Sequence, residues 1–157
     1  MAKNSCVVSN TNKKTMALAQ FDKGYTCSQA VFSAYAEDLG LDQETALKIA
    51  GPFGGGMGRK AETCGAVTDA LMVIGLEYGA IDATDSEAKE KAYALAREFL
   101  DRFETRHGSS RCKELLGWDI STPAGHEAAK YRQLFSTLCP KYVANAAEIV
   151  GEILAKS

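Results

Sequence analysis

Cysteines are the residues of this sequence best suited to chemistry. There are five, and the last four, Cys27, Cys64, Cys112 and Cys139, are spread over most of the 157-residue chain. Thiolates bind metals and iron–sulfur clusters, and pairs of thiols cycle between dithiol and disulfide. No two of these four form a Cys-x-x-Cys pair, so the spacing indicates neither a thioredoxin-like dithiol nor a zinc ribbon. Cys6 stands apart in a polar N-terminal stretch and is not assigned to the site.

The four later cysteines share one predicted position, at or near the start of a helix. There, free backbone N–H groups and the positive end of the helix dipole stabilise a thiolate over a thiol. Basic residues near each cysteine, such as Arg59 and Lys60 before Cys64, act in the same direction. Four thiols so placed predict one shared redox or metal site. The expected helix starts are Cys27 after a Thr26–Gln29 capping box, Cys64 after Thr63, Cys112 in the first turn after Ser110, and Cys139 directly before Pro140.

Helices must position these cysteines, because apolar residues recur at helical spacing almost throughout the chain and no useful alternating strand pattern appears. A second capping box, Thr84 with Glu87, is expected to begin the fifth helix. The predicted fold class is all-α, an irregular bundle of about six to eight helices. Residues 11–157 form a single helical domain after a flexible N-terminal segment, residues 1–10. The expected helices cover residues 12–23, 27–39, 42–50, 64–78, 84–107, 110–116, 127–137 and 139–154, with turns at 51–60 and 117–125.

Glycines crowd the segment that directly precedes Cys64, which predicts a loop there. The loop lacks the Walker spacing that ends in Gly-Lys-Ser/Thr, and no strand precedes it, so it is not a nucleotide-binding fingerprint. We expect its backbone to pass close to Cys64 and its metal or disulfide partner; a phosphate-binding nest is the weaker alternative. The candidates for backbone contact with a cofactor are Gly54, Gly55, Gly56 and Gly65.

Composition and charge exclude several classes of protein. The net charge is −2 and 46% of the residues are hydrophobic, so bulk electrostatics predict no nucleic-acid partner and no binding to anionic membranes. The longest strongly apolar stretch, residues 70–76, is too short to span a bilayer, so no membrane insertion is expected. With no signal peptide, the predicted location is cytoplasmic, where multiple cysteines indicate metal or redox chemistry rather than structural disulfides. The redox partner is left open, and so is a homodimer.

The segment Phe53–Gly75, which contains Cys64-Gly-Ala-Val-Thr-Asp69, resembles the C-GCAxxG-C-C family of redox-active proteins. The resemblance extends from about Thr15 to Ile153. One departure is Asp69, which stands where the family has glycine. If that glycine permits close helix packing, either the packing is looser here or Asp69 faces water. The other matching pieces are Cys27 within Tyr25–Val31, Cys112 within Gly108–Gly117, and Cys139 ahead of an alanine-rich C-terminal helix.

The resemblance implies a redox-active protein with four characteristic cysteines. A related helical domain occurs in split-Soret cytochrome c, where an iron–sulfur centre is associated with it. This favours Cys27, Cys64, Cys112 and Cys139 as ligands of an iron–sulfur cluster used for electron transfer or redox sensing. Two alternatives stay open: the same cysteines could be the catalytic residues of a metal-free thiol/disulfide oxidoreductase or sensor, or they could hold zinc in a structural binding module. The sequence does not decide between an oxidoreductase and an electron carrier.

Overall fold

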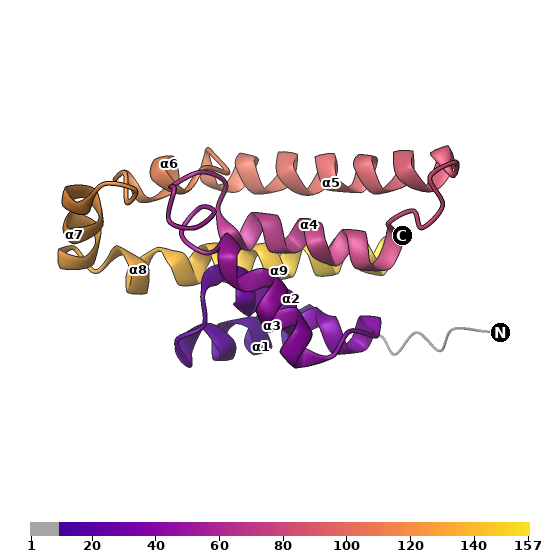
Figure 1. Ribbon diagram of the computed structural model, residues 1–157, viewed down its shortest axis with the longest axis horizontal. Helices are drawn as coiled ribbons and strands as arrows, with labels where there is room; N and C mark the ends of the chain where they lie inside the picture. Colours follow the sequence, from indigo (N-terminus) through magenta and orange to yellow (C-terminus); the bar gives the residue numbers. More distant parts are fainter. Residues whose placement is uncertain (1–9) are drawn as a thin grey trace.

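Helices form nearly all of the regular structure in the computed structural model of the chain, which describes residues 10–157 (Figure 1). Two short 3₁₀ turns, Glu37–Leu39 and Gly51–Phe53, follow α2 and α3. Within the described residues the only β feature is one bridge between Thr63 and Arg111. The predicted all-α fold is therefore confirmed. The helices are α1 Asn10–Asp22, α2 Cys27–Ala36, α3 Gln43–Ala50, α4 Gly65–Tyr78, α5 Ser86–His107, α6 Cys112–Leu116, α7 Pro123–Tyr131, α8 Leu134–Thr137 and α9 Cys139–Lys156.

The predicted flexible segment, residues 1–10, lies outside the described residues except for Asn10, which begins α1. Cys6 also lies outside them. From residue 10 onward, no helix combines the length and the apolar character that crossing a membrane requires.

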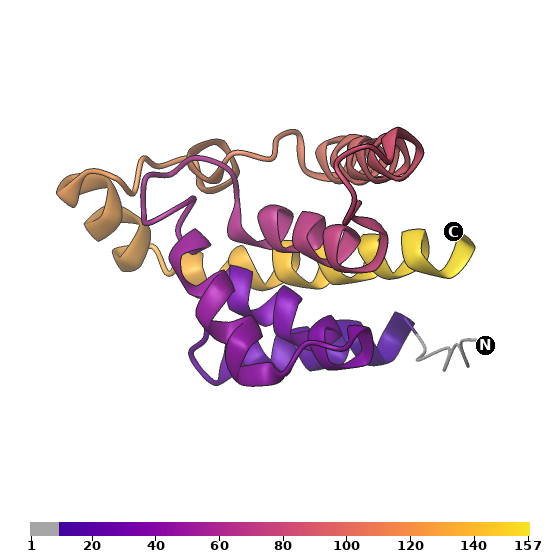
Figure 2. The same ribbon diagram turned by 45° about the vertical axis from the view of Figure 1, so that its right-hand side comes forward.

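The main core lies between α1, α2, α4 and α9. The most extensive helix contacts join α1 to α9, α2 to α4 and α1 to α2, and α9 also packs against α4 and α5. The ribbon views show α9 as the central helix, with α1–α3 on one side and α4 and α5 on the other (Figures 1 and 2). Its buried face follows the helical spacing of its apolar residues, which is why the sequence predicts this helix well. That face consists of Val143, Ala146, Ala147, Val150 and Ile153.

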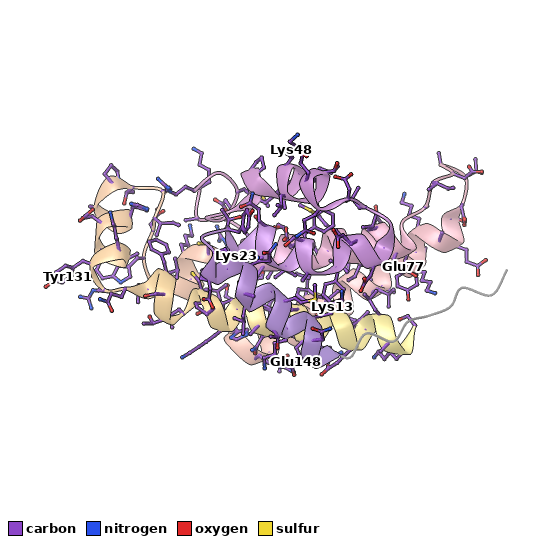
Figure 3. The ribbon with its side chains drawn as sticks, turned by 90° about the horizontal axis from the view of Figure 1, so that it is seen from below. Lys13, Lys23, Lys48, Glu77, Tyr131 and Glu148 are labelled. Atoms are coloured by element: carbon purple, nitrogen blue, oxygen red, sulfur yellow. The ribbon has the colours of Figure 1, made fainter. Side chains whose placement is uncertain are left out.

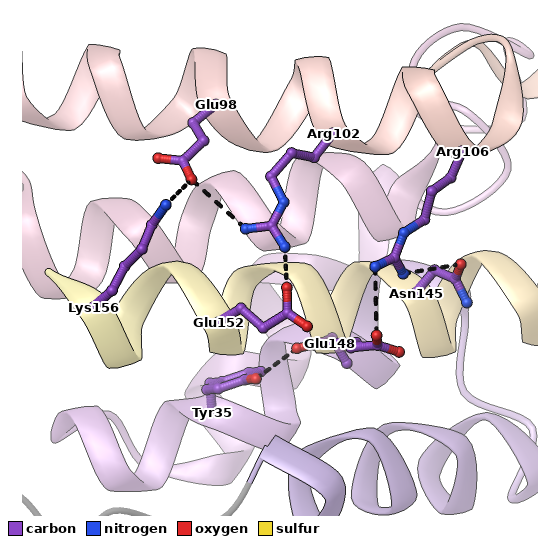
Figure 4. Close-up of polar contacts among 9 residues, drawn as sticks. Tyr35, Glu98, Arg102, Arg106, Asn145, Glu148, Glu152 and Lys156 are labelled. Carbon is purple, nitrogen blue, oxygen red and sulfur yellow. Dashed lines mark hydrogen bonds and ion pairs between the residues drawn. The ribbon is translucent and has the colours of Figure 1, made fainter.

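Polar contacts attach the outer helices to this core. Arg102 on α5 pairs with Glu98 one turn earlier and with Glu152 on α9 (Figure 4). On the opposite side, the buried side chain of Lys13 on α1 lies 2.5 Å from the carboxylate of Asp38, which follows α2 (Lys13 is labelled in Figure 3). The outer helices on both sides of the core are therefore held by charge pairs as well as by apolar packing.

A second, smaller apolar cluster lies at the end of the bundle away from the C-terminus, where α6, α7 and α8 are found (Figure 1). Tyr131, 86% exposed, stands at its outer edge (Figure 3). Because this cluster is separate from the main core, the fold has an internal boundary between the two. The buried members of the second cluster are Ala61, Cys112, Leu116, Ile120 and Ala129.

The predicted capping box at the start of α5 is wrong, because a neighbouring carboxylate takes the capping position. Asp85 is the N-cap, and its side chain accepts the N–H of Ala88 at 2.9 Å. Thr84 is turned away and bonds to Asp82. A carboxylate is a strong N-cap because it also carries charge toward the positive end of the helix dipole.

The predicted caps Thr63 and Ser110 are also wrong. Thr63 pairs with Arg111 in the β-bridge, so that Cys64 itself becomes the N-cap of α4, with no side-chain capping bond. The hydroxyl of Ser110 donates to Glu104 at 2.7 Å rather than serving α6. In both cases a tertiary contact takes the group that local sequence assigns to a cap.

The predicted helix over residues 127–137 is two helices. Pro123 occupies the first turn of α7, and the hydroxyl of Thr122 accepts the N–H of Gly125 at 3.0 Å. Gln133 then adopts a left-handed φ of 56°, which separates α7 from α8. The predicted turn at 117–125 is therefore shorter than expected, because its proline starts a helix instead of preventing one.

Candidate functional site

A single cavity of about 560 Å³ is lined by all four described cysteines. Each of them is a free thiol. Cys27 and Cys64 pack with the main core, whereas Cys112 and Cys139 pack with the second cluster. The cavity therefore lies where the two apolar clusters meet. In both ribbon views the loop that precedes α4 lies between α6 and the first turns of α9 (Figures 1 and 2).

The predicted placement at helix starts is confirmed for each cysteine. Cys27 is the first residue of α2, Cys112 of α6 and Cys139 of α9, and Cys64 is the N-cap of α4. The capping box before Cys27 forms in full, with both of its reciprocal hydrogen bonds. The local sequences that begin four helices thus also present four sulfurs to one cavity.

A short backbone pairing holds the segments of Cys64 and Cys112 side by side. The N–H of Cys64 donates to the carbonyl of Ser110 at 2.8 Å, and the N–H of Cys112 donates to the carbonyl of Glu62 at 2.6 Å. The guanidinium of Arg111 also donates to the Glu62 carboxylate at 3.1 Å. This pairing joins two segments that are far apart in the chain, and it is too short to leave a strand pattern in the sequence.

Cys27 and Cys64 interact directly. The Cys64 thiol donates a hydrogen bond to the Cys27 sulfur, and this bond, with the N–H groups of Gly55, Ser28 and Gly65, lowers the pKa of Cys27 to about 6 against the opposing effect of burial. The same hydrogen bond, followed by burial, raises the pKa of Cys64 well above its usual range. Near neutral pH Cys27 is therefore the thiolate of the pair and Cys64 is the thiol.

Cys112 and Cys139 differ from Cys27. Burial, reinforced by the charge of Cys27, raises the pKa of each to about 12. The expectation that every helix start stabilises a thiolate therefore holds for Cys27 alone among the four. At Cys112 and Cys139 loss of hydration outweighs the nearby N–H groups, and at Cys64 the hydrogen bond to Cys27 has the largest effect, followed by burial.

Close backbone approach shapes the site around Cys27. A β-carbon on Gly65 would lie only 2.7 Å from the Cys27 sulfur, so this position has no room for a side chain. Of the four glycines predicted to contact a cofactor, Gly54, Gly55 and Gly65 line the cavity, and Gly56 is not among its lining residues. The sequence predicts that these glycines bring the backbone close to Cys64. In the structure they also bring it close to the sulfur of Cys27.

The predicted loop at 51–60 is present, and its backbone is left-handed. Residues 55–59 all have φ between 60° and 73°, and Ala61 has a φ of 58°. Met57, Arg59 and Ala61 have β-carbons, for which this conformation costs about 1–2 kcal/mol per residue. Strain of this kind persists where the surrounding structure enforces it, and it is concentrated at functional sites.

The lining residues that the sequence did not assign to the site include Arg59, His126 and Tyr142. The sequence marks Arg59 only as a basic neighbour of Cys64. The His126 ring lies 5.6 Å from the ring of Phe135, and the Tyr142 hydroxyl donates to the carbonyl of Leu115 at 2.8 Å. Tyr142 lies three residues after Cys139 on α9, a spacing that places both on one face of the helix, whereas Arg59 and His126 have no helical spacing to a cysteine and are revealed by the tertiary fold.

Asp69, the departure from the family motif, is fully buried on α4. Its Oδ2 accepts the backbone N–H of Phe32 on α2 at 2.7 Å, and its Oδ1 has no hydrogen-bond partner among the described residues. Burial raises the pKa of this carboxyl well above its usual range, against the effect of that hydrogen bond. Of the two alternatives that the sequence left open, the one in which Asp69 faces water is therefore wrong, because the carboxyl lies inside the contact between α2 and α4.

As the described side chains stand, no three or more His, Cys, Asp or Glu residues form a group that could hold a metal ion. The chain was also compared with known proteins. A family model described as "Putative redox-active protein (C_GCAxxG_C_C)" matches residues 25–153. Neither the curated proteins nor the solved structures gave a match.

Proposed function

Because the chain belongs to the C_GCAxxG_C_C family of redox-active proteins, we propose that Cys27, Cys64, Cys112 and Cys139 hold one iron–sulfur cluster used for electron transfer or redox sensing. The observation that carries this proposal is that all four thiols line one cavity. When bound, the cluster would accept and release single electrons.

The donors around the cavity fit such a group. Four thiolates and a cluster carry net negative charge, and among the described residues no aspartate or glutamate lines the cavity. The N–H groups that bond to the Cys27 sulfur would also stabilise a cluster ligand and tune its potential. The missing side chain at Gly65 keeps this face of the sulfur clear.

The spacing of the cysteines in the chain supports a cluster over a single structural zinc ion. Structural zinc sites usually take their cysteines in close pairs, about two to four residues apart. No two of Cys27, Cys64, Cys112 and Cys139 lie closer than 27 residues in the sequence, although all four border the same cavity.

The hydrogen bond between Cys27 and Cys64 supports a second candidate function, a metal-free thiol/disulfide couple. The Cys27 thiolate would attack one sulfur of an oxidised partner's disulfide, releasing a partner thiolate and forming a mixed disulfide. Cys64, after losing its proton, would then displace the second partner sulfur, leaving a Cys27–Cys64 disulfide and a reduced partner. This candidate gives Cys112 and Cys139 no role, which is why we rank it second.

Anaerobic purification separates the two candidates. For the cluster, we expect brown protein with iron and acid-labile sulfide, and loss of both when any one of Cys27, Cys64, Cys112 or Cys139 is changed to serine. For the dithiol couple, we expect colourless protein in which mild oxidation removes two thiols, lost only on Cys27→Ser or Cys64→Ser. Protein that takes up no iron after anaerobic reconstitution would exclude the cluster, and zinc at one per chain without a redox response would exclude both.

A further inference from the structure

The cavity extends beyond the four sulfurs into the second apolar cluster. Leu116, Ile120, His126 and Phe135 line it there, and they come from α6, α7, α8 and the segment that joins α6 to α7. The rings of His126 and Phe135 lie 5.6 Å apart at an interplanar angle of 41°. This part of the wall presents apolar and aromatic surface beside Cys112 and Cys139, which belong to the same cluster. At about 560 Å³, the whole cavity is within the range of pockets that hold small organic molecules.

Arg59 gives this cavity one full positive charge. The side chain is exposed on the loop before α4, and it forms no ion pair with any other described residue. Most of the cavity lining is apolar, and no described aspartate or glutamate belongs to it. The cavity therefore has a cation without a protein carboxylate to pair with. An anion that enters the cavity would pair with Arg59 without displacing a protein carboxylate from it.

The loop holds Arg59 in a conformation that it would not adopt alone. Its φ is 64°, within a left-handed run that also includes residues without glycine's freedom, Met57 and Ala61. The N–H of Arg59 donates to the carbonyl of Gly54 at 3.3 Å, which keeps the turn closed. A glycine would suit this backbone better, so the loop holds the arginine at this place against its own backbone preference.

We propose that the cavity binds a small aromatic carboxylic acid beside the cysteines, with its carboxylate on Arg59 and its ring against His126, Phe135 and Ile120. A bidentate guanidinium–carboxylate contact is the strongest pairing that this lining offers. Planar rings favour stacked or edge-on contacts with the two aromatic side chains. Binding of the acid requires no cluster. The proposal rests on the proposed function only for the statement that the bound acid lies beside a redox centre.

The competing role for Arg59 is to balance the negative charge of the cysteine site alone. The two roles differ in what the loss of the guanidinium removes. If Arg59 serves the acid, the change Arg59→Gln abolishes acid binding and leaves the iron content intact. If Arg59 serves only the cysteines, the same change lowers the iron content, and the cavity has no acid binding to lose.

The experiment is a titration of the full-length chain, as purified anaerobically and after chelation, with 2-naphthoate and with its neutral amide, 2-naphthamide. We expect naphthoate to bind roughly ten- to hundredfold more tightly than the amide, which is the factor that a charge-assisted hydrogen bond supplies. Arg59→Gln should remove that preference. Lys60→Gln is the matched control, because Lys60 is the adjacent cation but does not line the cavity, and it should keep the preference.

Equal affinity for acid and amide in the unaltered protein, or no binding of either, would overturn the proposal without need of any variant. An unchanged preference in Arg59→Gln would also overturn it, as would a joint loss of iron and naphthoate binding. If the preference is found and no preparation contains iron, the acid site stands and the cluster proposal fails. Helical circular dichroism of both variants verifies that they are folded.

Discussion

The carboxyl group of Asp69 on α4 accepts the backbone N–H of Phe32 on α2 at 2.7 Å, inside the contact between these two helices. Phe32 is in the same short helix as Cys27, so the carboxyl ties α4 to the helix that begins with the low-pKa cysteine. A glycine at position 69, as in the family motif, would leave this contact to packing alone. In this chain a buried carboxyl with one hydrogen bond is added to the extensive packing between α2 and α4.

The Asp69 carboxyl should make the protein less stable as the pH rises. Its folded pKa is raised, and above the ordinary value of 3.8 the unfolded chain releases this proton while the folded chain keeps it. Folding then takes up a proton, so the contribution is full below pH 3.8 and is lost as the pH rises toward the folded pKa, by about 1.4 kcal/mol per pH unit. The free energy of unfolding of the unaltered protein, minus that of Asp69→Asn, should fall over this range in urea titrations.

Asp82→Asn is the matched control for that experiment. Asp82 is exposed, and hydrogen bonds from Thr84 lower the pKa of its carboxyl. Its contribution to stability therefore has the opposite sign: it is present above the ordinary pKa and is lost as the pH falls. A difference curve for Asp69→Asn that is flat or rises with pH would show that this carboxyl is ionised in the folded protein.

The sequence predicts the parts of this site that depend on local chemistry. The Thr26 capping box and Pro140 predict helices that begin at Cys27 and Cys139, and apolar periodicity predicts a first turn that contains Cys112, because a helix start is determined within a few residues of the chain. The concentration of glycines before Cys64 likewise predicts a loop. These are short-range rules, and the four cysteines are found by them.

Tertiary contacts decide the rest. Thr63 does not cap α4 because it forms a bridge with Arg111. Arg59 lies at the cavity because the loop before α4 makes a left-handed turn, which hydrogen bonds within the loop keep closed. His126 lies on α7 and reaches the cavity through the packing of α7 against α8. Helical spacing carries no information about which helix ends meet, so the two apolar clusters and the cavity between them could not be predicted.

Gly65→Ala should disrupt the Cys27 end of the site. The added methyl group would lie 2.7 Å from the Cys27 sulfur, with the Ser28 backbone N at 3.0 Å, so α2 and α4 must separate. We expect a loss of about 1–3 kcal/mol in the free energy of unfolding, as is typical of overpacking, together with a higher pKa for Cys27. Chemical denaturation and thiol titration measure the two effects.

Gly75→Ala provides the control on the same helix. Nothing lies within 4 Å of a β-carbon at Gly75, and alanine is the better helix former by about 0.5–1 kcal/mol. This variant should therefore be more stable than the unaltered protein and keep the same Cys27 pKa. Equal behaviour of the two variants would mean that the close approach of Gly65 to Cys27 has no energetic consequence.

Alkylation of the reduced, metal-free protein should distinguish the four thiols. The rate at Cys27 should rise with pH through a midpoint near its pKa of about 6, because the thiolate is the reactive form. Cys112 and Cys139, with pKa values of about 12, should react slowly across the same range. Iodoacetamide labelling followed by peptide mass spectrometry gives each rate separately.

Cys64→Ala tests the cause of that reactivity. It removes the thiol whose hydrogen bond is the largest effect lowering the Cys27 pKa, so the midpoint at Cys27 should move to higher pH. Cys139→Ala removes a thiol that contributes nothing to that lowering and should leave the midpoint in place. A Cys27 midpoint that is the same in both variants would assign its low pKa to the backbone N–H groups instead.

Loading the cysteine site should stabilise the second apolar cluster more than the main core. Cys27 and Cys64 pack with the main core and Cys112 and Cys139 with the second cluster, so a group bound to all four joins two parts that otherwise meet at a cavity. Ligands stabilise the states that bind them, and the local opening of α6–α8 breaks this site.

Hydrogen exchange measures this effect. After anaerobic reconstitution with iron and sulfide, the amides of Ile120 and Ala129 should exchange with deuterium at least roughly tenfold more slowly than in the metal-free protein. The amide of Val150, deep in the main core, serves as the internal reference and should change less. Iron-loaded protein in which α6–α8 exchange as fast as before would show that Cys112 and Cys139 do not hold the bound group.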